Sequence, residues 1–310
     1  CFRKFAGGEL CRANDMITSG EDEGFSLVDQ EDMDEHVAVQ NMVSKACIRF
    51  GDEILLLLRI AEDCPAPEGE IADAMARKMQ RAIDALGLRP GMDVFDMGGG
   101  WGCFVEYAGL QGIRIHCITI SEEQLAHANA RIDAEGLQDR IDLRLCDYRE
   151  IEGEYDKLVS IEMIEAVGHE FYSSYFAKCS DLLKPNGKMV IQAITMTDQH
   201  YERALQEVDF IKRYIFPGGC LTSVTGMTQT LTRHTDMRVI HIEDIGPHYA
   251  TTLQHWRERF FERIEEVRAM GFDDRFIRMW DYYLSISEAG FRTGMTQDLQ
   301  IALAKSRGRP

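Results

Sequence analysis

The spacing of hydrophobic residues changes along the chain, and each change predicts an element. From residue 71 to 86 apolar residues recur at helical spacing, and Gly87 follows directly. This pattern predicts a helix that ends at Gly87. Residues 94–97 then form a short, mostly apolar run of the kind found in buried strands, and a run of glycines follows it.

Strand and helix patterns alternate from there to about residue 195. The predicted strands are 94–97, 113–120, 141–145, 155–164 and 188–195. Between them, one predicted helix begins after Ser121 and another spans 171–183, and a turn follows at 184–187. This alternation predicts an α/β fold with a doubly wound, mainly parallel, Rossmann-like sheet, whose ligands bind outside the carboxyl ends of the strands. Residues 200–310 break the alternation with helical patterns at 250–270 and 276–290. We expect these to form a helical lid and a C-terminal cover.

Residues 1–69 show no sustained period. They carry acidic clusters such as Glu21-Asp22-Glu23 and end in Pro65-Ala-Pro67. We expect an irregular, acidic N-terminal region ahead of a domain at 70–310. The first residue is Cys1 rather than Met, which predicts a fragment or a processed product.

The composition narrows the class of protein. A chain of 310 residues with 45% hydrophobic content can bury a large core, and its net charge of −18 would repel nucleic-acid phosphates and disfavours a nucleic-acid partner. The nine cysteines show no C-x-x-C pair, which favours a reduced, cytoplasmic protein without a metal site over a disulfide framework. No signal-peptide pattern is visible, and no run approaches the roughly 20 apolar residues of a membrane span.

A glycine-rich loop follows the first strand, with the sequence Asp96-Met-Gly98-Gly-Gly100-Trp-Gly102. Its spacing, D-x-G-x-G-x-G, differs from the G-x-G-x-x-G of dinucleotide-binding proteins. It is the spacing of class I S-adenosylmethionine-dependent methyltransferases, in which the glycines let the backbone approach an adenosyl amino acid. Taken alone, a glycine turn of any α/β protein remains an alternative.

The carboxyl-end rule gathers five segments at the rim of one crevice. They are 96–102, 119–124, 147–148, 162–165 and 192–194. Gln124 or Glu122 can accept from ribose hydroxyls there, although acids at a helix start also complement the helix dipole. Glu165 is flanked by apolar residues and is a candidate base or ligand anchor. Glu162 lies on the alternate side of the strand pattern and has the weaker claim.

Taken together, the motifs resemble those of the cyclopropane-fatty-acid synthase and mycolic acid methyltransferase family, from about residue 70 to the C-terminus. The glycine loop is similar to the family's D-I-G-C-G-W-G, with Gly99 in place of the cysteine. The other matching segments are Ile118-Thr-Ile-Ser121-Glu-Glu-Gln124, Val159-Ser-Ile-Glu-Met-Ile-Glu165, Tyr214-Ile-Phe-Pro-Gly-Gly-Cys-Leu221, Arg278-Met-Trp-Asp-Tyr-Tyr-Leu284 and Gly290-Phe-Arg292.

The resemblance implies bound S-adenosylmethionine. The implied cofactor-binding residues are Asp96, Gly98, Gly100, Gly102, Thr119, Ile120 and Gln124, with Tyr148 near the adenine.

The resemblance also implies a bound bicarbonate that accepts a proton during the reaction. Glu165, Ile194 and Tyr249 match three of the family's bicarbonate-binding positions, and Gln192 stands where the family has histidine. The family's N-terminal Y-S-x-A-Y segment is missing, and Cys64, two residues out of register, is the nearest match to its cysteine.

The resemblance implies a methyltransferase that acts on the double bond of an unsaturated phospholipid acyl chain, with peripheral membrane contact and, as one option, a homodimer. The product can be a cyclopropane, a methyl branch or a methylene group. Two alternatives stay open: a small-molecule N- or C-methyltransferase, and a catalytically idle cofactor-binding homologue.

Overall fold

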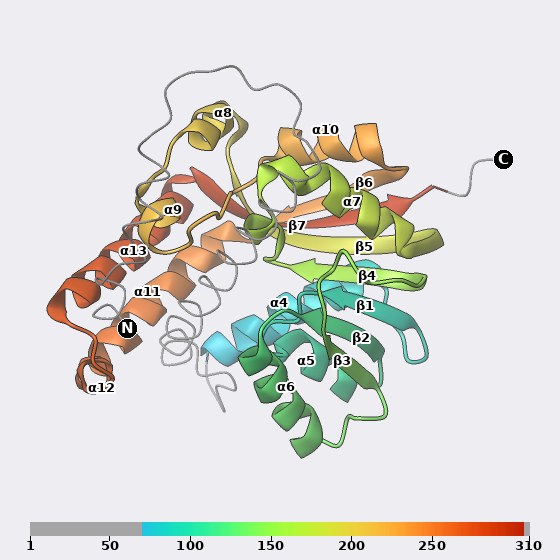
Figure 1. Ribbon diagram of the computed structural model, residues 1–310, viewed down its shortest axis with the longest axis horizontal. Coiled ribbons are helices and arrows are strands. Elements are labelled where there is room, and N and C mark those ends of the chain that lie inside the picture. Colours follow the sequence, from blue (N-terminus) through green and yellow to red (C-terminus); the bar gives the residue numbers. More distant parts are fainter. Residues whose placement is uncertain (1–69, 307–310) are drawn as a thin grey trace, which may run out of the picture. The chain divides into compact units, whose positions relative to one another are not determined.

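The computed structural model of the chain describes residues 70–306 (Figure 1). The predicted irregular region 1–69, with Cys64, lies outside the described residues, as do residues 307–310.

The described part is built on a seven-stranded mixed sheet with the strand order β3-β2-β1-β4-β5-β7-β6. The strands are β1 (Asp93–Met97), β2 (Arg114–Thr119), β3 (Ile141–Leu145), β4 (Tyr155–Ile161), β5 (Leu183–Met196), β6 (Met237–Asp244) and β7 (Thr296–Lys305). Strands β1 to β5 pair in parallel, and β7 runs antiparallel to both β5 and β6. The predicted doubly wound, mainly parallel sheet is confirmed.

Neighbouring residues on each central strand pack into different cores, because successive side chains point to opposite faces of a sheet. On one face Val94 and Val159 pack under α4 (Glu70–Leu86), α5 (Cys103–Leu110) and α6 (Glu122–Ala134). On the other face Phe95 and Leu158 pack under α7 (Tyr172–Asp181) and α10 (Val224–His234). Both faces are therefore covered, which explains the nearly continuous apolar strands.

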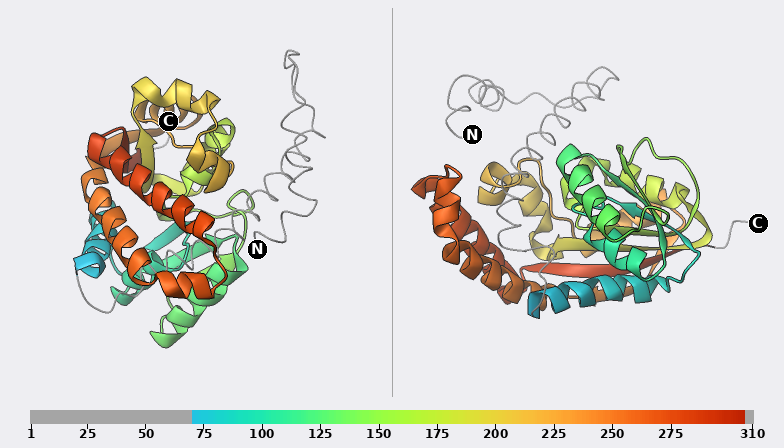
Figure 2. Two further views of the ribbon diagram at one scale, coloured as in Figure 1. Left: turned by 90° about the vertical axis from the view of Figure 1, so that its left-hand side faces the viewer. Right: turned by 90° about the horizontal axis from the view of Figure 1, so that it is seen from below.

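The helix boundaries follow local signals that were visible in the sequence. Helix α4 ends at Leu86, and Gly87 takes a φ of 61°, a left-handed conformation that suits glycine at a helix end. Ser121 caps α6, because its hydroxyl accepts a hydrogen bond from the backbone N–H of Gln124. Helix α4 lies along its face of the sheet against β5 and β7 (Figure 2).

The sequence pattern was wrong about parts of the C-terminal third. Strands β6 and β7 lie where a lid and a cover were predicted, and β7 inserts between β5 and β6. In β7, Leu299 and Ile301 enter one core, while Asp298 and Gln300 occupy the alternate positions and are also buried. The turn predicted at 184–187 falls inside β5, where the register with β4 shifts.

Helices gather at one end of the sheet (Figures 1 and 2). They are α8 (Asp198–Gln206), α9 (Phe210–Tyr214), α11 (Gly246–Glu262), α12 (Ile264–Ala269) and α13 (Asp274–Thr293). Helices α11 and α13 pack along each other around Trp256 and Trp280. They correspond to the helices predicted at 250–270 and 276–290. None of the helices in residues 70–306 has the length and apolar character that crossing a membrane requires.

Candidate active site

The glycine loop turns tightly between β1 and α5. Gly98, Gly100 and Gly102 have φ angles of 102°, 52° and 86°, which L side chains rarely adopt. A Cβ atom on Gly98 would lie 3.0 Å from the Met163 Cγ, so the loop backbone packs directly against the segment after β4. A Cβ on Gly100 would meet no atom of the described residues within 4 Å. The backbone at Gly100 therefore borders open space at the carboxyl end of β1, where a ligand can approach it.

Asp96 supports this loop from below. Its side chain is buried, and one carboxyl oxygen lies 3.7 Å from the Cys117 Sγ. Burial raises the pKa of Asp96 to about 7, although the hydrogen bond from Cys117 opposes the shift. Asp96 thus lies beneath the loop rather than on the open rim.

Thr119 and Gln124 are joined at the end of β2. The Thr119 hydroxyl donates to the Gln124 side-chain carbonyl at 2.8 Å, and the Gln124 backbone N–H donates to the Ser121 cap in the first turn of α6. Since this carbonyl is occupied, the amide NH₂ of Gln124 is the end that can donate to a ligand oxygen. Ile120, between them in sequence, is 53% exposed.

Tyr148 lies just beyond β3 and packs edge-to-face against Tyr175, with ring centroids 5.7 Å apart. Burial raises the pKa of Tyr148 to about 12, so its hydroxyl is neutral at ordinary pH.

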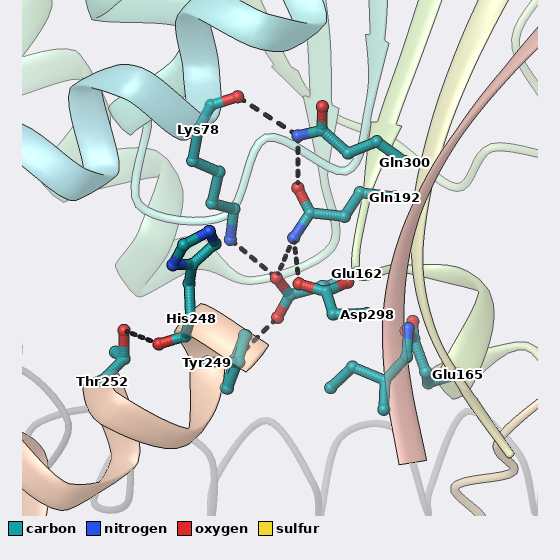
Figure 3. A network of polar contacts seen from close by, with 10 residues as sticks. Lys78, Glu162, Glu165, Gln192, His248, Tyr249, Thr252, Asp298 and Gln300 are labelled. Carbon is teal, nitrogen blue, oxygen red and sulfur yellow. Dashed lines mark hydrogen bonds and ion pairs between the residues drawn. The ribbon is translucent and has the colours of Figure 1, made fainter. Parts of the chain in front are cut away.

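A second group of polar side chains centres on Glu162, directly after β4 (Figure 3). Lys78 Nζ and Gln192 Nε2 each lie 2.6 Å from Glu162 Oε1. The Tyr249 hydroxyl donates to Glu162 Oε2 at 3.1 Å. Three donors from α4, β5 and α11 therefore converge on one carboxylate.

Residues of β7 extend the group behind Gln192. Gln192 Nε2 also donates to Asp298 Oδ2 at 2.8 Å, and Gln300 Nε2 donates to Gln192 Oε1 at 3.0 Å. Gln300 donates as well to the Lys78 backbone carbonyl at 3.2 Å (Figure 3). Burial raises the pKa of the Asp298 carboxyl, and the charge of Glu162 adds to the shift. We call Lys78, Glu162, Gln192, Tyr249, Asp298 and Gln300 the Glu162 network.

Glu165 lies apart from this network. Its Oε1 accepts from the Ile194 backbone N–H at 2.5 Å, while Oε2 is buried with no hydrogen-bond partner among the described residues. Burial raises the pKa of Glu165 to about 8, and the charge of Glu162 contributes to the shift. At neutral pH the Glu165 side chain is therefore mostly a neutral carboxylic acid.

The sequence analysis placed Glu165, Ile194, Tyr249 and Gln192 around one bound bicarbonate. In the structure Glu165 accepts from the Ile194 N–H, whereas Tyr249 and Gln192 donate to Glu162. Glu162, ranked below Glu165 from the strand pattern, is the centre of the network.

Sequence reasoning missed three members of the network. Asp298 and Gln300 alternate with apolar residues in β7, and this signal is readable only once β7 is recognised as a strand. Lys78 gave no signal, because it is one of several charged residues on an amphipathic helix.

The surroundings of the network are apolar and aromatic. The Tyr249 ring stacks on Phe291 with centroids 4.8 Å apart, and Ile194 packs against the same cluster between α11 and α13. Phe210 of α9 contacts Tyr282 of α13, with centroids 4.7 Å apart. The charged groups of the network thus lie at the end of the sheet, and the adjoining helices present apolar and aromatic side chains beside them.

Comparisons with known proteins agree with this architecture. The family model described as mycolic acid cyclopropane synthetase matches residues 62–301. A tuberculostearic acid methyltransferase of Mycobacterium tuberculosis is 41% identical over 236 residues, which are 76% of this chain and 55% of that protein. A cyclopropane-fatty-acyl-phospholipid synthase of Escherichia coli is 35% identical over 238 residues, 76% of this chain and 59% of that protein. The match thus spans little more than half the length of these two relatives.

Solved structures share the fold. A cyclopropane synthase from Mycobacterium tuberculosis superposes with a TM-score of 0.70 at 26% identity, covering 77% of this chain and 87% of that one. A mycolic acid cyclopropane synthase complexed with SAH and CTAB gives a TM-score of 0.70 at 25% identity, covering 78% and 87% of the two chains. With a family model over more than three quarters of its length and two relatives above 30% identity, this chain belongs to the mycolic acid cyclopropane synthetase family.

Proposed function

We propose that this chain is an S-adenosylmethionine-dependent methyltransferase that modifies the double bond of an unsaturated fatty acyl chain in a phospholipid. The observation that carries the proposal is the position of the Glu162 network, which adjoins the glycine loop through the contact of Gly98 with Met163. Relatives named for lipid methylation and for cyclopropane synthesis support the substrate class.

The loop and rim fit S-adenosylmethionine. Open space at Gly100 leaves room for the ligand to reach the backbone, and the Gln124 amide has its donor end available for ribose oxygens. Exposed Ile120 and half-buried Tyr148 offer apolar surface for the adenine. Trp101 Nε1, in the loop itself, is buried without a hydrogen-bond partner among the described residues. When bound, the sulfonium supplies a methyl group, whose C–S bond breaks as a C–C bond to the substrate forms.

The chain's own residues then have two tasks. The apolar side chains around Tyr249 and Ile194 hold a hydrocarbon substrate and exclude water, which aligns the alkene and protects it from competing reactions. Glu162, directly after β4, and Asp298, near the start of β7, provide carboxyl oxygens that can accept the proton that leaves after methyl transfer.

The test is transfer of isotopically labelled methyl groups. We expect the protein to label vesicles of a cis-unsaturated phosphatidylglycerol and not vesicles of its saturated analogue. Mass spectrometry of the released fatty acids then separates cyclopropane, methylene and methyl-branched products.

The same experiment separates the alternatives. Label in an amine panel but not in lipid would indicate a small-molecule methyltransferase. Donor binding by calorimetry without transfer to any acceptor would indicate an idle homologue. Either result would contradict the proposal.

A further inference from the structure

Donors that the family resemblance assigns to a bound bicarbonate already have acceptors in this protein. Both hydrogens of the Gln192 amide are used, one by Glu162 and one by Asp298. The Tyr249 hydroxyl donates to Glu162, and the Ile194 N–H donates to Glu165. An added anion would find these donors occupied. It would also lie beside the Glu162 carboxylate, whose negative charge opposes it. The residues present do not fit bicarbonate.

The backbone of Glu162 is held in a conformation that is unfavourable for any residue other than glycine. Its φ is 50°, and among the described residues only Asn186 is another non-glycine residue with positive φ. A left-handed backbone costs an L-residue other than glycine roughly 1–2 kcal/mol, and strain of this kind collects at functional sites. The backbone N–H of Glu162 donates to the backbone carbonyl of Gln192 at 2.9 Å, which fixes the Glu162 backbone beside β5. A glutamate thus occupies a position that glycine would fill without strain.

Glu162 is also the acid that a substrate can reach. Its side chain is 23% exposed, whereas the carboxyl group of Glu165 is buried and mostly protonated at neutral pH. Lys78, Gln192 and Tyr249 orient the Glu162 carboxylate and offset its charge. Each of its oxygens has more than one lone-pair site, so it can still accept a proton.

We infer that Glu162 is the general base of this enzyme and takes the place of bicarbonate. The inference rests on the proposed function. After methyl transfer to one alkene carbon, the other carbon is positively charged. Glu162 takes a proton from a neighbouring C–H or from the new methyl group. The C–H electron pair forms a double bond in the first case and closes a three-membered ring in the second. Glu162 becomes a carboxylic acid and returns its proton to water after product release.

The first test measures binding and needs no turnover. Wild-type protein titrated with ¹³C-bicarbonate and followed by ¹³C NMR should show no saturable binding. Glu162→Gly should fold, because glycine accepts the left-handed backbone, and should bind bicarbonate, because the Gln192 and Tyr249 donors are released. Saturable bicarbonate binding by the wild type would overturn the inference.

The second test measures turnover in CO₂-free buffer. Wild-type turnover should not change when bicarbonate is added. Glu162→Gly should lose about 100- to 10,000-fold, the usual worth of a general base, and regain part of the loss with bicarbonate. Its affinity for S-adenosylmethionine should stay near that of the wild type. The matched control is Glu154→Gln, an exposed acid just ahead of the opposite end of β4.

The outcomes separate the inference from the function on which it rests. A wild-type enzyme that methylates lipid only with bicarbonate, or a Glu162→Gly variant with full turnover in CO₂-free buffer, would overturn the role of Glu162 and leave the function intact. A wild-type protein that transfers no label would remove the proposed function, while the NMR titration would still report whether the site takes bicarbonate.

Discussion

The Sγ atom of Cys117 fills the space beneath Gly99, where a Cβ atom built on the glycine would lie only 2.1 Å from the sulfur. The related glycine loops carry a cysteine at the position of Gly99. In this chain a cysteine occupies the same region from the neighbouring strand β2. Gly99 and Cys117 therefore compete for one space, which the sulfur of Cys117 fills and a side chain at position 99 could not share.

This pair predicts a non-additive effect on stability. Gly99→Ala should lower the free energy of unfolding by about 1–3 kcal/mol, the usual cost of overpacking. The same change in a Cys117→Ala background should cost much less, because the sulfur has been removed. A double-mutant cycle from urea unfolding measures the coupling. Equal costs in the two backgrounds would show that the residues do not compete for space.

The geometry of the glycine loop predicts that Gly100→Val weakens the binding of S-adenosylmethionine. A branched side chain would occupy the open space through which the ligand reaches the backbone. The matched control is Gly136→Val, because Gly136 has a similar φ of 65° and, within residues 70–306, also has no neighbour within 4 Å of a built Cβ. Calorimetry with S-adenosylmethionine should show weakened binding only for Gly100→Val. Equal affinity in both folded variants would exclude the loop as the binding site.

Gln300 predicts a positioning effect on turnover. Its amide donates to the Gln192 carbonyl and so directs the Gln192 NH₂ toward Glu162. Gln300→Glu replaces this donor by an acceptor and should turn the Gln192 amide around. We expect turnover to fall about 10- to 100-fold, as for a lost hydrogen bond to a charged group, while the affinity for S-adenosylmethionine stays unchanged. If turnover and affinity fell together, Gln300 would have only a structural role.

The buried carboxyl of Glu165 predicts a pH-dependent stability difference. Its pKa rises from 4.5 to about 8 on folding, so between these values the folded state binds the proton more strongly than the unfolded state. Its contribution is fully present below pH 4.5 and is lost as the pH rises through 8. Glu165→Gln cannot ionise. Its melting temperature should therefore rise relative to the wild type between pH 5 and pH 9, and a constant difference would contradict the shift.

Exposed apolar side chains near α9 and α13 predict membrane contact that does not depend on attraction between charges. Val208 is 74% exposed and Tyr282 is 50% exposed, while the chain carries a net charge of −18. Binding to anionic vesicles should therefore persist or strengthen as salt screens the repulsion. In sedimentation, Val208→Asp with Tyr282→Ser should weaken binding, and Ile240→Asp, 44% exposed on edge strand β6, should not. Binding that falls steeply with salt would contradict this prediction.

The sequence by itself determined the features that depend on neighbouring residues. The period of 71–86 and the following Gly87 marked α4, and the Ser121 cap marked α6. Glycine spacing located the loop, because only glycine adopts its positive φ angles readily. The alternation of strands and helices then predicted which chain segments meet at the carboxyl edge, since parallel strands all end there.

Only the tertiary structure decided which acid holds the centre of the site. The period-two rule ranked Glu162 below Glu165, but it fails after β4, where the backbone turns left-handed at Glu162 and redirects the side chain. The network also joins residues far apart in sequence, such as Gln300 and Lys78, which are 222 positions apart. Their contact depends on the insertion of β7 between β5 and β6, a long-range pairing that no local pattern specifies.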